Sequence, residues 1–315
     1  MMNRVRLLHV TEFEYDGPVS ESYNEVHLRP RDDEWQSCLS FRLITRPAAA
    51  GSAHRDYFGN WVHRFNILAP HRTLRIEAAS VVMLHPAPPV GELPPLHELD
   101  GRRQELAEEF FEFLAPSHYV PHPPALGELI AASEAASGGT VAGFARAATR
   151  MIYERFRYEK GATHVHSSAD QVLATGAGVC QDFAHLLLAI ARVRGIPGRY
   201  VSGYHLPGGD TGDAVSGGLA SHAWAEILIP GEGWLGLDPT QGDAVGERHI
   251  RLAYGRDYGD VPPVRGTFRG HAGQRLSVDV RVRPGVDGTG RELLRGTTGA
   301  PVETPPPAAA PQQQQ

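Results

Sequence analysis

Cysteine is scarce in this chain, because its 315 residues include only Cys38 and Cys180. Two cysteines this far apart are a poor disulfide framework for a chain of this length, so we expect two free thiols. Free thiols are typical of a reducing compartment, and we therefore expect a cytoplasmic protein. In this interpretation Cys38 is buried and inert, and Cys180 is the reactive thiol.

Long apolar runs and an excess of positive charge are also absent. No run approaches the roughly 18 apolar residues that a membrane span needs. The opening segment MMNRVRLLHVTEFEY is interrupted by charged and polar residues, which predicts a strand and not a secretory signal. The net charge of -6 and the pI near 6.2 give no electrostatic attraction to nucleic acid or anionic membranes, so we expect neither partner.

The apolar content is sufficient for more than one core. Hydrophobic residues make up 41% and charged residues 21%, and a chain of this length suggests two domains of about 150 residues each. Residues 1–85 alternate apolar and polar side chains with a period of two, which predicts a small antiparallel β-sandwich. The stretch HPAPPVGELPP has five prolines in eleven residues, so we expect a stiff linker over 86–100.

Beyond the linker the apolar period becomes helical, and we assign residues 101–283 to a second, mixed domain of an α+β chain. Helices are expected at Glu105–Leu114, at Val141–Ile152, and from near Cys180 to Gly195. Strands are expected at Arg199–Tyr204, His222–Ile229, Trp234–Asp238 and Leu276–Val282. Residues 284–315 end in Pro, Ala and Gln, which predicts a disordered tail.

Cys180 stands directly after a glycine-rich turn, in GAGVCQDFAH, at the expected first turn of a helix. Unpaired backbone N–H groups and the helix dipole favour a thiolate at that position. The same N–H groups can face an oxyanion. A small buried hydrophobic residue could open a helix in the same way, so the position alone leaves both interpretations open. We expect Asp182 to support the helix start and not to perform chemistry.

His222 and Asp238 flank a turn signal, IPGEGW, that joins two expected strands. His222 lies eight residues before Pro230 and Asp238 eight after it, so a hairpin that turns there places them opposite each other. The carboxylate could then accept a hydrogen bond from one imidazole nitrogen and leave the other for Cys180. A slip of one residue would put the two side chains on opposite faces. Each residue alone has an ordinary structural explanation, but together they favour a catalytic triad.

Other histidines raise the question of a metal site. His164 and His166 have a spacing that is usable on a strand, and His185 and His205 follow further on. No second cysteine or dense carboxylate cluster accompanies them, so we predict no metal and no cofactor. Residues 205–220 are rich in Gly and polar residues, which predicts a surface loop that could border a cleft.

Residues 167–241 resemble the core of the transglutaminase-like superfamily, whose fold is similar to that of papain-like cysteine proteases. The resemblance rests on GVCQDFAHLLLAIARVRGIPGRYVSGY, SHAWAEILIPGEGWLGLDPTQG and HIRLAYGRDYGDVPPVRG. Residues 1–85 are similar to the β-rich domain that precedes this core in many bacterial members. The resemblance maps the nucleophile to Cys180, the base to His222 and the orienting carboxylate to Asp238, and implies that residues 101–283 are the catalytic domain.

The reaction that the resemblance implies is attack of Cys180 on an amide of a polypeptide or peptide-like substrate, through a thioester. Water would resolve the thioester in a peptidase and an amine would resolve it in a transglutaminase. We favour hydrolysis of a peptide or isopeptide amide, because the loop composition indicates an open cleft. A non-catalytic binding module on the same fold is the other alternative. Tyr158 is a candidate for a second oxyanion donor that the sequence does not place.

Overall fold

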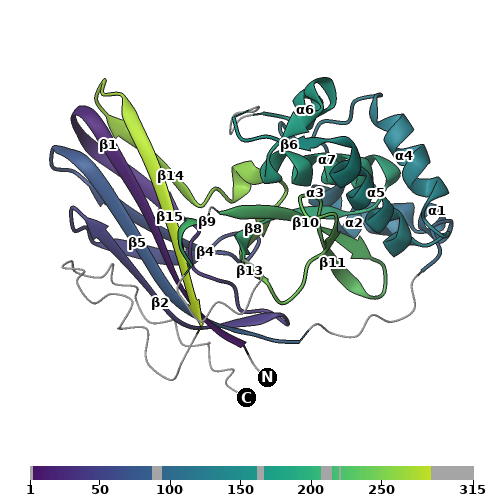
Figure 1. Ribbon diagram of the computed structural model, residues 1–315, viewed down its shortest axis with the longest axis horizontal. Coiled ribbons are helices and arrows are strands. Elements are labelled where there is room, and N and C mark those ends of the chain that lie inside the picture. The colour runs from purple at the N-terminus through teal and green to yellow at the C-terminus, as the bar shows by residue number, and fades with distance from the viewer. Residues whose placement is uncertain (1–2, 87–93, 162–166, 207–214, 220, 285–315) are drawn as a thin grey trace, which may run out of the picture.

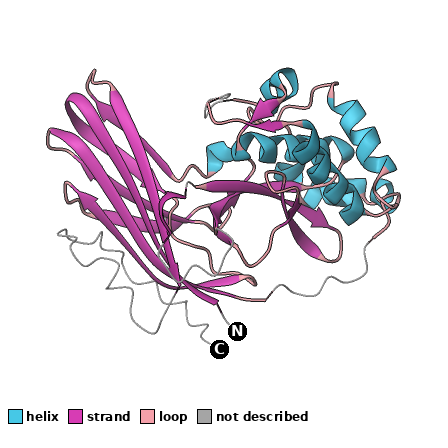
Figure 2. Ribbon diagram, in the orientation of Figure 1, coloured by secondary structure: helices cyan, strands magenta, loops and turns pink. Residues whose placement is uncertain are grey.

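The computed structural model describes residues 3–86, 94–161, 167–206, 215–219 and 221–284. It is an α+β protein, as predicted, with an antiparallel β domain on one side and a helical core domain on the other (Figures 1 and 2). Among the residues that the structure describes, no helix is long and apolar enough to cross a membrane. The predicted tail, apart from Pro284, and the proline-rich residues 87–93 lie outside the described ranges.

The β domain is one curled antiparallel sheet organised around a single long strand, β1 (Asn3–Val26). The first half of β1 pairs with β5 and β15, and its second half pairs with β4 and β14. The pairing shifts between Glu14 and Val19, where Gly17 and Pro18 interrupt the ladder. Because proline has no N–H to donate, this interruption bends the strand and lets one sheet curl over its own core.

The other strands of this domain follow the same antiparallel scheme. They are β2 (Gln36–Arg46), β3 (Gly51–Arg55), β4 (Trp61–Ile67), β5 (His71–Leu84), β9 (Val215–Leu219), β14 (Val264–Arg269) and β15 (Gln274–Pro284). The antiparallel β structure expected in the N-terminal part of the chain is present over the described residues 3–84, and the expected small sandwich takes the form of a curled sheet.

Strands β14 and β15 correct the expected extent of the catalytic domain. Both pair with β1, so the chain returns to the N-terminal domain after about residue 263. The sequence predicted the strand at Leu276–Val282 but assigned it to residues 101–283. Alternating apolar and charged residues identify a half-buried strand and carry no information on which sheet it joins. Strand β9 is a second correction, because part of the loop expected over 205–220 pairs with β15.

The core domain is built on a five-stranded antiparallel sheet in the order β12-β11-β10-β8-β13. Its strands are β8 (Gly198–His205), β10 (His222–Ile229), β11 (Gly233–Asp238), β12 (Asp243–Ala244) and β13 (His249–Gly255). Helix α7 (Cys180–Arg194) packs against β10 and is buried over most of its length. It ends as predicted at Gly195, whose φ of 88° suits a glycine that closes a helix.

The remaining helices lie on the right of Figure 1, together with α7. They are α1 (Glu98–Gly101), α2 (Arg103–Glu109), α3 (Phe111–Leu114), α4 (Leu126–Ala135), α5 (Val141–Arg155) and α6 (Ala169–Thr175), with a 3-10 turn at Tyr258–Asp260. The predicted apolar stripe on α5 is buried as expected. The predicted helix over 105–114 is divided between α2 and α3, and α1 begins within the expected linker.

The two domains share a packed boundary. Tyr204 on β8 and Ile250 and Leu252 on β13 belong to the apolar core of the β domain. The Tyr204 hydroxyl lies 2.8 Å from Nδ1 of the buried His9 on β1. This packing fixes the β domain against the sheet that carries the candidate site.

Candidate active site

Cys180 is the first residue of α7, directly after the short strand β7 (Ala177–Gly178). The carboxylate of Asp182 accepts a hydrogen bond of 2.8 Å from the N–H of Val179, which confirms that Asp182 supports the helix start. A Cβ at Gly178 would lie 2.9 Å from Cβ of Asp182, so the preceding turn requires glycine there. The helix start is therefore tightly built, and it presents a half-buried free thiol at its first position.

Tyr158 lies close to the thiol. Strand β6 (Arg157–Tyr158) pairs in parallel with β7, and Tyr158 is opposite Gly178. Burial raises the pKa of Tyr158, and the negative charges of Cys180, Asp238 and Asp182 raise it further. Tyr158 is 48% exposed, so it is not sealed in the core.

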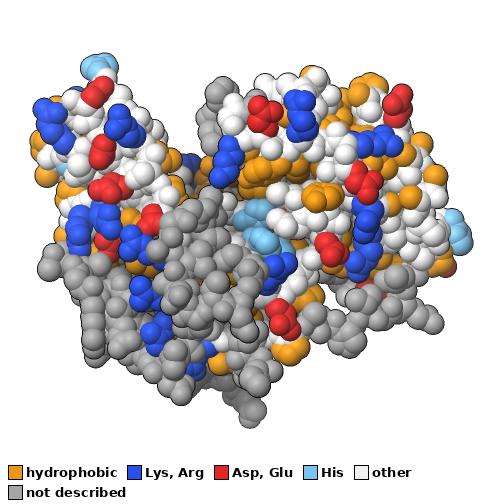
Figure 3. Space-filling model, in the orientation of Figure 1, with side chains coloured by type: hydrophobic (Ala, Val, Ile, Leu, Met, Phe, Trp, Pro, Cys, Tyr) orange, Lys and Arg blue, Asp and Glu red, His pale blue; other side chains and the backbone are white. Residues whose placement is uncertain are grey.

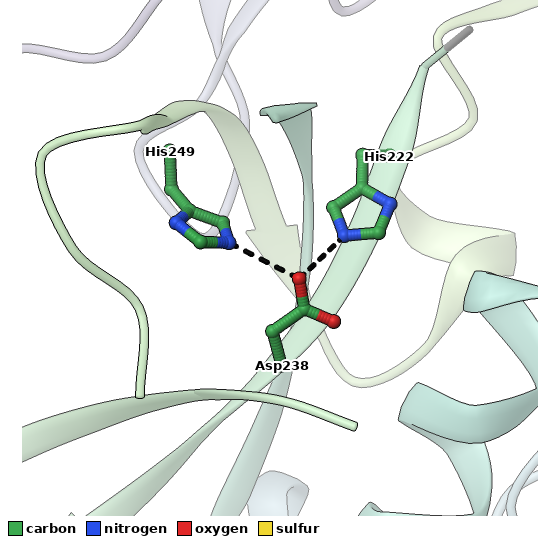
Figure 4. Close-up of side chains that lie close together, drawn as sticks. All are labelled: His222, Asp238 and His249. Atoms are coloured by element: carbon green, nitrogen blue, oxygen red, sulfur yellow. Dashed lines mark hydrogen bonds and ion pairs between the residues drawn. The ribbon is translucent and has the colours of Figure 1, made fainter. Parts of the chain in front are cut away.

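His222 and Asp238 form the pair that the hairpin pattern predicted. Nε2 of His222 lies 2.7 Å from Oδ2 of Asp238 (Figure 4). The register differs from the expected one, because Ala225 pairs with Leu237, which places Asp238 two residues short of the position opposite His222. A shift of two residues keeps both side chains on one face, whereas a shift of one would have separated them.

The hydrogen bond to Asp238 decides which nitrogen of His222 faces the thiol. Nε2 is occupied by the carboxylate, so Nδ1 is the nitrogen that remains for Cys180. Burial opposes protonation of His222, but hydrogen bonds to Asp238 and Cys180 and their negative charges prevail and raise its pKa to about 10. The imidazole is thus held between a carboxylate and a thiol and favours its protonated form at neutral pH.

His249 is a residue of this site that the sequence did not indicate. Its Nε2 lies 3.1 Å from the same oxygen, Oδ2 of Asp238, on the side away from His222 (Figure 4). The N–H of Gly246 donates to Nδ1 of His249, so the proton of the neutral ring is on Nε2 and points at Asp238. His249 comes from β13, and no local pattern linked it to the hairpin.

Asp238 is fully buried and receives hydrogen bonds on both oxygens. The N–H of Thr240 donates to Oδ1 at 2.9 Å, and the two histidines share Oδ2. Burial works against the charged carboxylate, yet the hydrogen bonds from His222 and His249 hold the pKa of Asp238 well below its usual range. The carboxylate is therefore ionised and fixed in orientation.

The four histidines that raised the question of a metal site are either packed among other side chains or outside the described residues. His205 packs against His249 with ring centroids 4.6 Å apart, and burial, together with His249 and His222, lowers its pKa to about 4. His185 is fully buried, and burial lowers its pKa to about 3. His164 and His166 fall in the range 162–166, which is not described.

His222, Asp238 and His249 are also the kind of residues that can hold a metal ion. Both histidine nitrogens, however, stand at hydrogen-bond distance from a single carboxylate oxygen. Protons on the two rings account for these contacts without an ion.

Cys180 and His222 line one side of a cavity of about 650 Å³, and the inner face of the β domain lines the other side. In the space-filling view, histidine side chains reach the surface at the border between the two lobes (Figure 3). The β domain therefore forms one wall of the cavity into which the thiol opens. The fold and the site together define a class: proteins in which a cysteine at a helix start faces a His–Asp pair on an antiparallel sheet.

Known families match both parts of the chain. The bacterial transglutaminase-like N-terminal region matches residues 5–83, and the transglutaminase-like superfamily matches residues 130–239. The chain is 36% identical to an uncharacterised protein of Mycobacterium leprae, over 89% of this chain and 99% of that protein. It is 38% identical to an uncharacterised protein of Mycobacterium tuberculosis, over 84% and 87% of the two chains. The chain belongs to the bacterial transglutaminase-like family.

Two further comparisons bear on the fold and on the activity. A solved structure from Cytophaga hutchinsonii, described as a "putative cysteine protease", has a TM-score of 0.68 at 22% identity and covers 92% of this chain and 93% of its own, which shows the fold. A protein-glutamine gamma-glutamyltransferase of Pseudomonas aeruginosa is 32% identical over 40% of this chain and 19% of its own length. Family membership supports a cysteine-based activity that cleaves amides or transfers acyl groups.

Proposed function

We propose that this protein is a cysteine peptidase or amidase that hydrolyses a peptide or isopeptide amide through a thioester on Cys180. The observation that carries the proposal is the arrangement of Cys180 and His222 at one cavity wall with the buried Asp238 behind them, so that His222 is hydrogen-bonded to both neighbours. In a triad of this kind the thiol is the nucleophile, the imidazole transfers the proton, and the carboxylate orients the imidazole.

In the acylation step, the sulfur of Cys180 attacks the carbonyl carbon of the amide and forms a C–S bond. The first N–H groups of α7 have no acceptor within the helix, so they can donate to the oxyanion that develops. His222 gives its proton to the amide nitrogen, the C–N bond breaks, and the amine leaves. Asp238 keeps Nδ1 of His222 directed at the sulfur throughout.

In the deacylation step, His222 removes a proton from water as the water oxygen attacks the thioester carbon. The C–S bond then breaks, the carboxylic acid product leaves, and Cys180 recovers its starting state. Water access to the cavity supports this route, because Cys180 is half-buried and not sealed in the core. The cytoplasm is the location we propose, supported by the free thiols at both cysteines.

Acyl transfer from glutamine to an amine is the second candidate. The similarity of 40% of this chain to a protein-glutamine gamma-glutamyltransferase favours it. The same triad serves both reactions, and the acceptor decides between them. A non-catalytic module on this fold is the third possibility, which the intact arrangement of the three side chains argues against.

Mass spectrometry of a peptide library incubated with the protein, with and without a primary amine, tests the proposal. Hydrolysis predicts products that gain water at the cleaved amide even when the amine is in excess. Products that gain the amine in preference to water would establish the transferase instead. A library that wild type and Cys180→Ala leave equally unchanged would favour the non-catalytic module.

A further inference from the structure

Strand β15 carries an apolar stripe that runs from the buried core of the β domain into the cavity at Cys180. Val280 and Val282 are 0% and 8% exposed and belong to that core. Val278 and Leu276 continue the stripe on the same face, because alternate residues of a strand share a face, and they are 43% and 55% exposed. The outer half of the stripe therefore faces solvent beside the candidate nucleophile.

The neighbouring strand β1 widens this stripe into a wall. Phe13 lies opposite Leu276, and Thr11 lies opposite Val278. Further out, Tyr15 makes an edge-to-face contact with Phe268 of β14, with ring centroids 5.1 Å apart. All of these residues line the cavity that Cys180 and His222 line from the other side.

The chain path ties this wall to the candidate site. Strand β9 pairs with β15 where Leu219 lies opposite Val280. Three residues after Leu219 the chain reaches His222, the first residue of β10. Val278 and Leu276, which continue the stripe from Val280, therefore lie next to the point where the chain passes from the β domain to His222.

The electrostatics of the wall match an uncharged ligand. Among the described lining residues, Arg265 is the one with a permanent charge, and it is ion-paired with Glu25. The polar groups of β1 beside the wall are hydroxyls, an amide and the imidazole of His9, whose pKa burial lowers to about 4, and Asn24 already donates to the hydroxyl of Ser22. An apolar side chain that binds to this wall is buried against apolar surface, and its binding desolvates no charged group of the wall.

We propose that Phe13, Leu276 and Val278 form a substrate subsite that binds an apolar side chain of the polypeptide within a few residues of the scissile amide. The inference rests on the proposed function in taking a polypeptide as the ligand. It gives the β domain a direct part in specificity, because the subsite is built by β1 and β15 and the reacting groups by the core domain. Each methylene buried there is worth roughly fourfold in affinity.

The test compares the double variant Leu276→Gln, Val278→Thr with Leu39→Gln. Leu39 is a matched control, since it is 47% exposed on β2 of the same sheet and does not line the cavity. All three positions are exposed enough to accept polar side chains, and melting temperatures check that each variant is folded. Leu276→Gln alone serves as a second, milder variant.

The first readout is alkylation of Cys180 by N-benzyl iodoacetamide relative to iodoacetamide, followed by mass spectrometry of the peptide that contains Cys180. We expect the wild type to favour the benzyl reagent more than glutathione does. The double variant should lose this preference by about fourfold or more, and Leu39→Gln should keep it. A double variant with the wild-type preference would overturn the subsite.

The second readout is the sequence around the cut in a cleaved peptide library. Enrichment of apolar residues near the cut, reduced in the double variant through a higher KM, supports the subsite. Cuts without such enrichment overturn it. Alkylation requires no turnover, so selective alkylation without cleavage of any peptide would keep the subsite and reject the hydrolase.

Discussion

Two buried carboxylates lie on the two strands of one hairpin, and each is held by two basic side chains. Asp238 on β11 is shared by two histidines, and Glu226 on β10 is shared by two arginines. Both carboxylates are at most 1% exposed. The chemical difference between them lies in the partners, because histidine exchanges its proton near neutral pH and arginine does not.

The arginine-bound carboxylate belongs to the framework of the fold. Glu226 lies 2.6 Å from Nη2 of Arg199 and 2.6 Å from Nε of Arg251. Burial opposes its ionisation, but the two arginines lower the pKa of Glu226 to about 2. The side-chain amide of Gln36 on β2 donates to the backbone carbonyl of Arg251 and accepts from its backbone N–H. These two hydrogen bonds connect the ion pair of the core domain to the β domain.

The comparison teaches that equal burial and equal numbers of partners produce two different kinds of site. A carboxylate between arginines is locked in one charge state and stabilises a domain boundary. A carboxylate between histidines keeps a titratable ring directed at the Cys180 thiol. Substitutions at the two carboxylates and at their partners should therefore affect rate and stability differently.

Removing the nucleophile should give the largest loss of activity with the least change in stability. Cys180→Ala should reduce kcat on the order of 10⁶-fold, as loss of the nucleophile does in other triads, with little change in melting temperature. Cys38→Ala is the matched control and should keep full activity. Burial raises the pKa of Cys38 to about 11, so iodoacetamide should label Cys38 far more slowly than Cys180 at neutral pH. Equal labelling rates for the two thiols would contradict the assignment.

Exchanging each carboxylate for its amide should give opposite results. Asp238→Asn should lower kcat by about 10³–10⁴-fold, because the imidazole loses its tautomer and orientation. Glu226→Gln should keep much of the activity per folded molecule but lose about 3–5 kcal/mol of unfolding free energy, because it leaves two buried arginines unpaired. Urea unfolding and initial rates on the same samples provide the measurement. If Asp238→Asn is the less stable variant and the more active one, the comparison fails.

His249 should act through Asp238 as a positioning residue. His249→Phe removes the second hydrogen bond to the carboxylate, a charged contact worth about 1.5–3 kcal/mol, so kcat should fall roughly tenfold or more. His249→Gln can place an N–H near the former Nε2 and should recover most of the rate. A purely structural role predicts instead that both variants lose melting temperature and that neither changes the pH profile of kcat.

The smallest expected effect is a difference between the two carboxylates in how the unfolding free energy depends on pH. His222 has a raised pKa, so its pairing with Asp238 stabilises fully below about pH 6.5 and is lost as pH rises toward about 10. The difference in unfolding free energy between wild type and Asp238→Asn should therefore shrink from pH 7 to pH 10. The corresponding difference for Glu226→Gln should stay flat, because the lowered pKa of Glu226 matters only in acid. Parallel slopes for the two variants would refute this.

The sequence predicted the parts of the site that local patterns encode. The helix that begins at Cys180 follows from the glycine turn and the apolar stripe, and the shared face of His222 and Asp238 follows from the period of two. The register was off by two residues because the turn centres on Gly231, where glycines 231 and 233 both adopt positive φ. Turn geometry of that kind is not fixed by counting residues.

The features that the sequence did not predict all depend on contacts between distant segments. His249 reaches Asp238 from β13, which pairs with β8 and not with the hairpin. Residues 264–284 form strands whose partner, β1, stands at the opposite end of the chain. A strand pattern shows that a segment will pair but not with what, so a single sequence leaves such partners open.

The pairing of β1 with β15 also sets an order of events during synthesis. Val5 lies opposite Pro284, so the central strand of the β domain gains its second neighbour only when the last described strand has emerged. Domains commonly fold from the N-terminus as they leave the ribosome. In this chain the core domain between them can fold first, while the earlier half of the β domain waits with an open edge. The wall beside Cys180 therefore stays incomplete until β15 has emerged, because Leu276 and Val278 come from that strand.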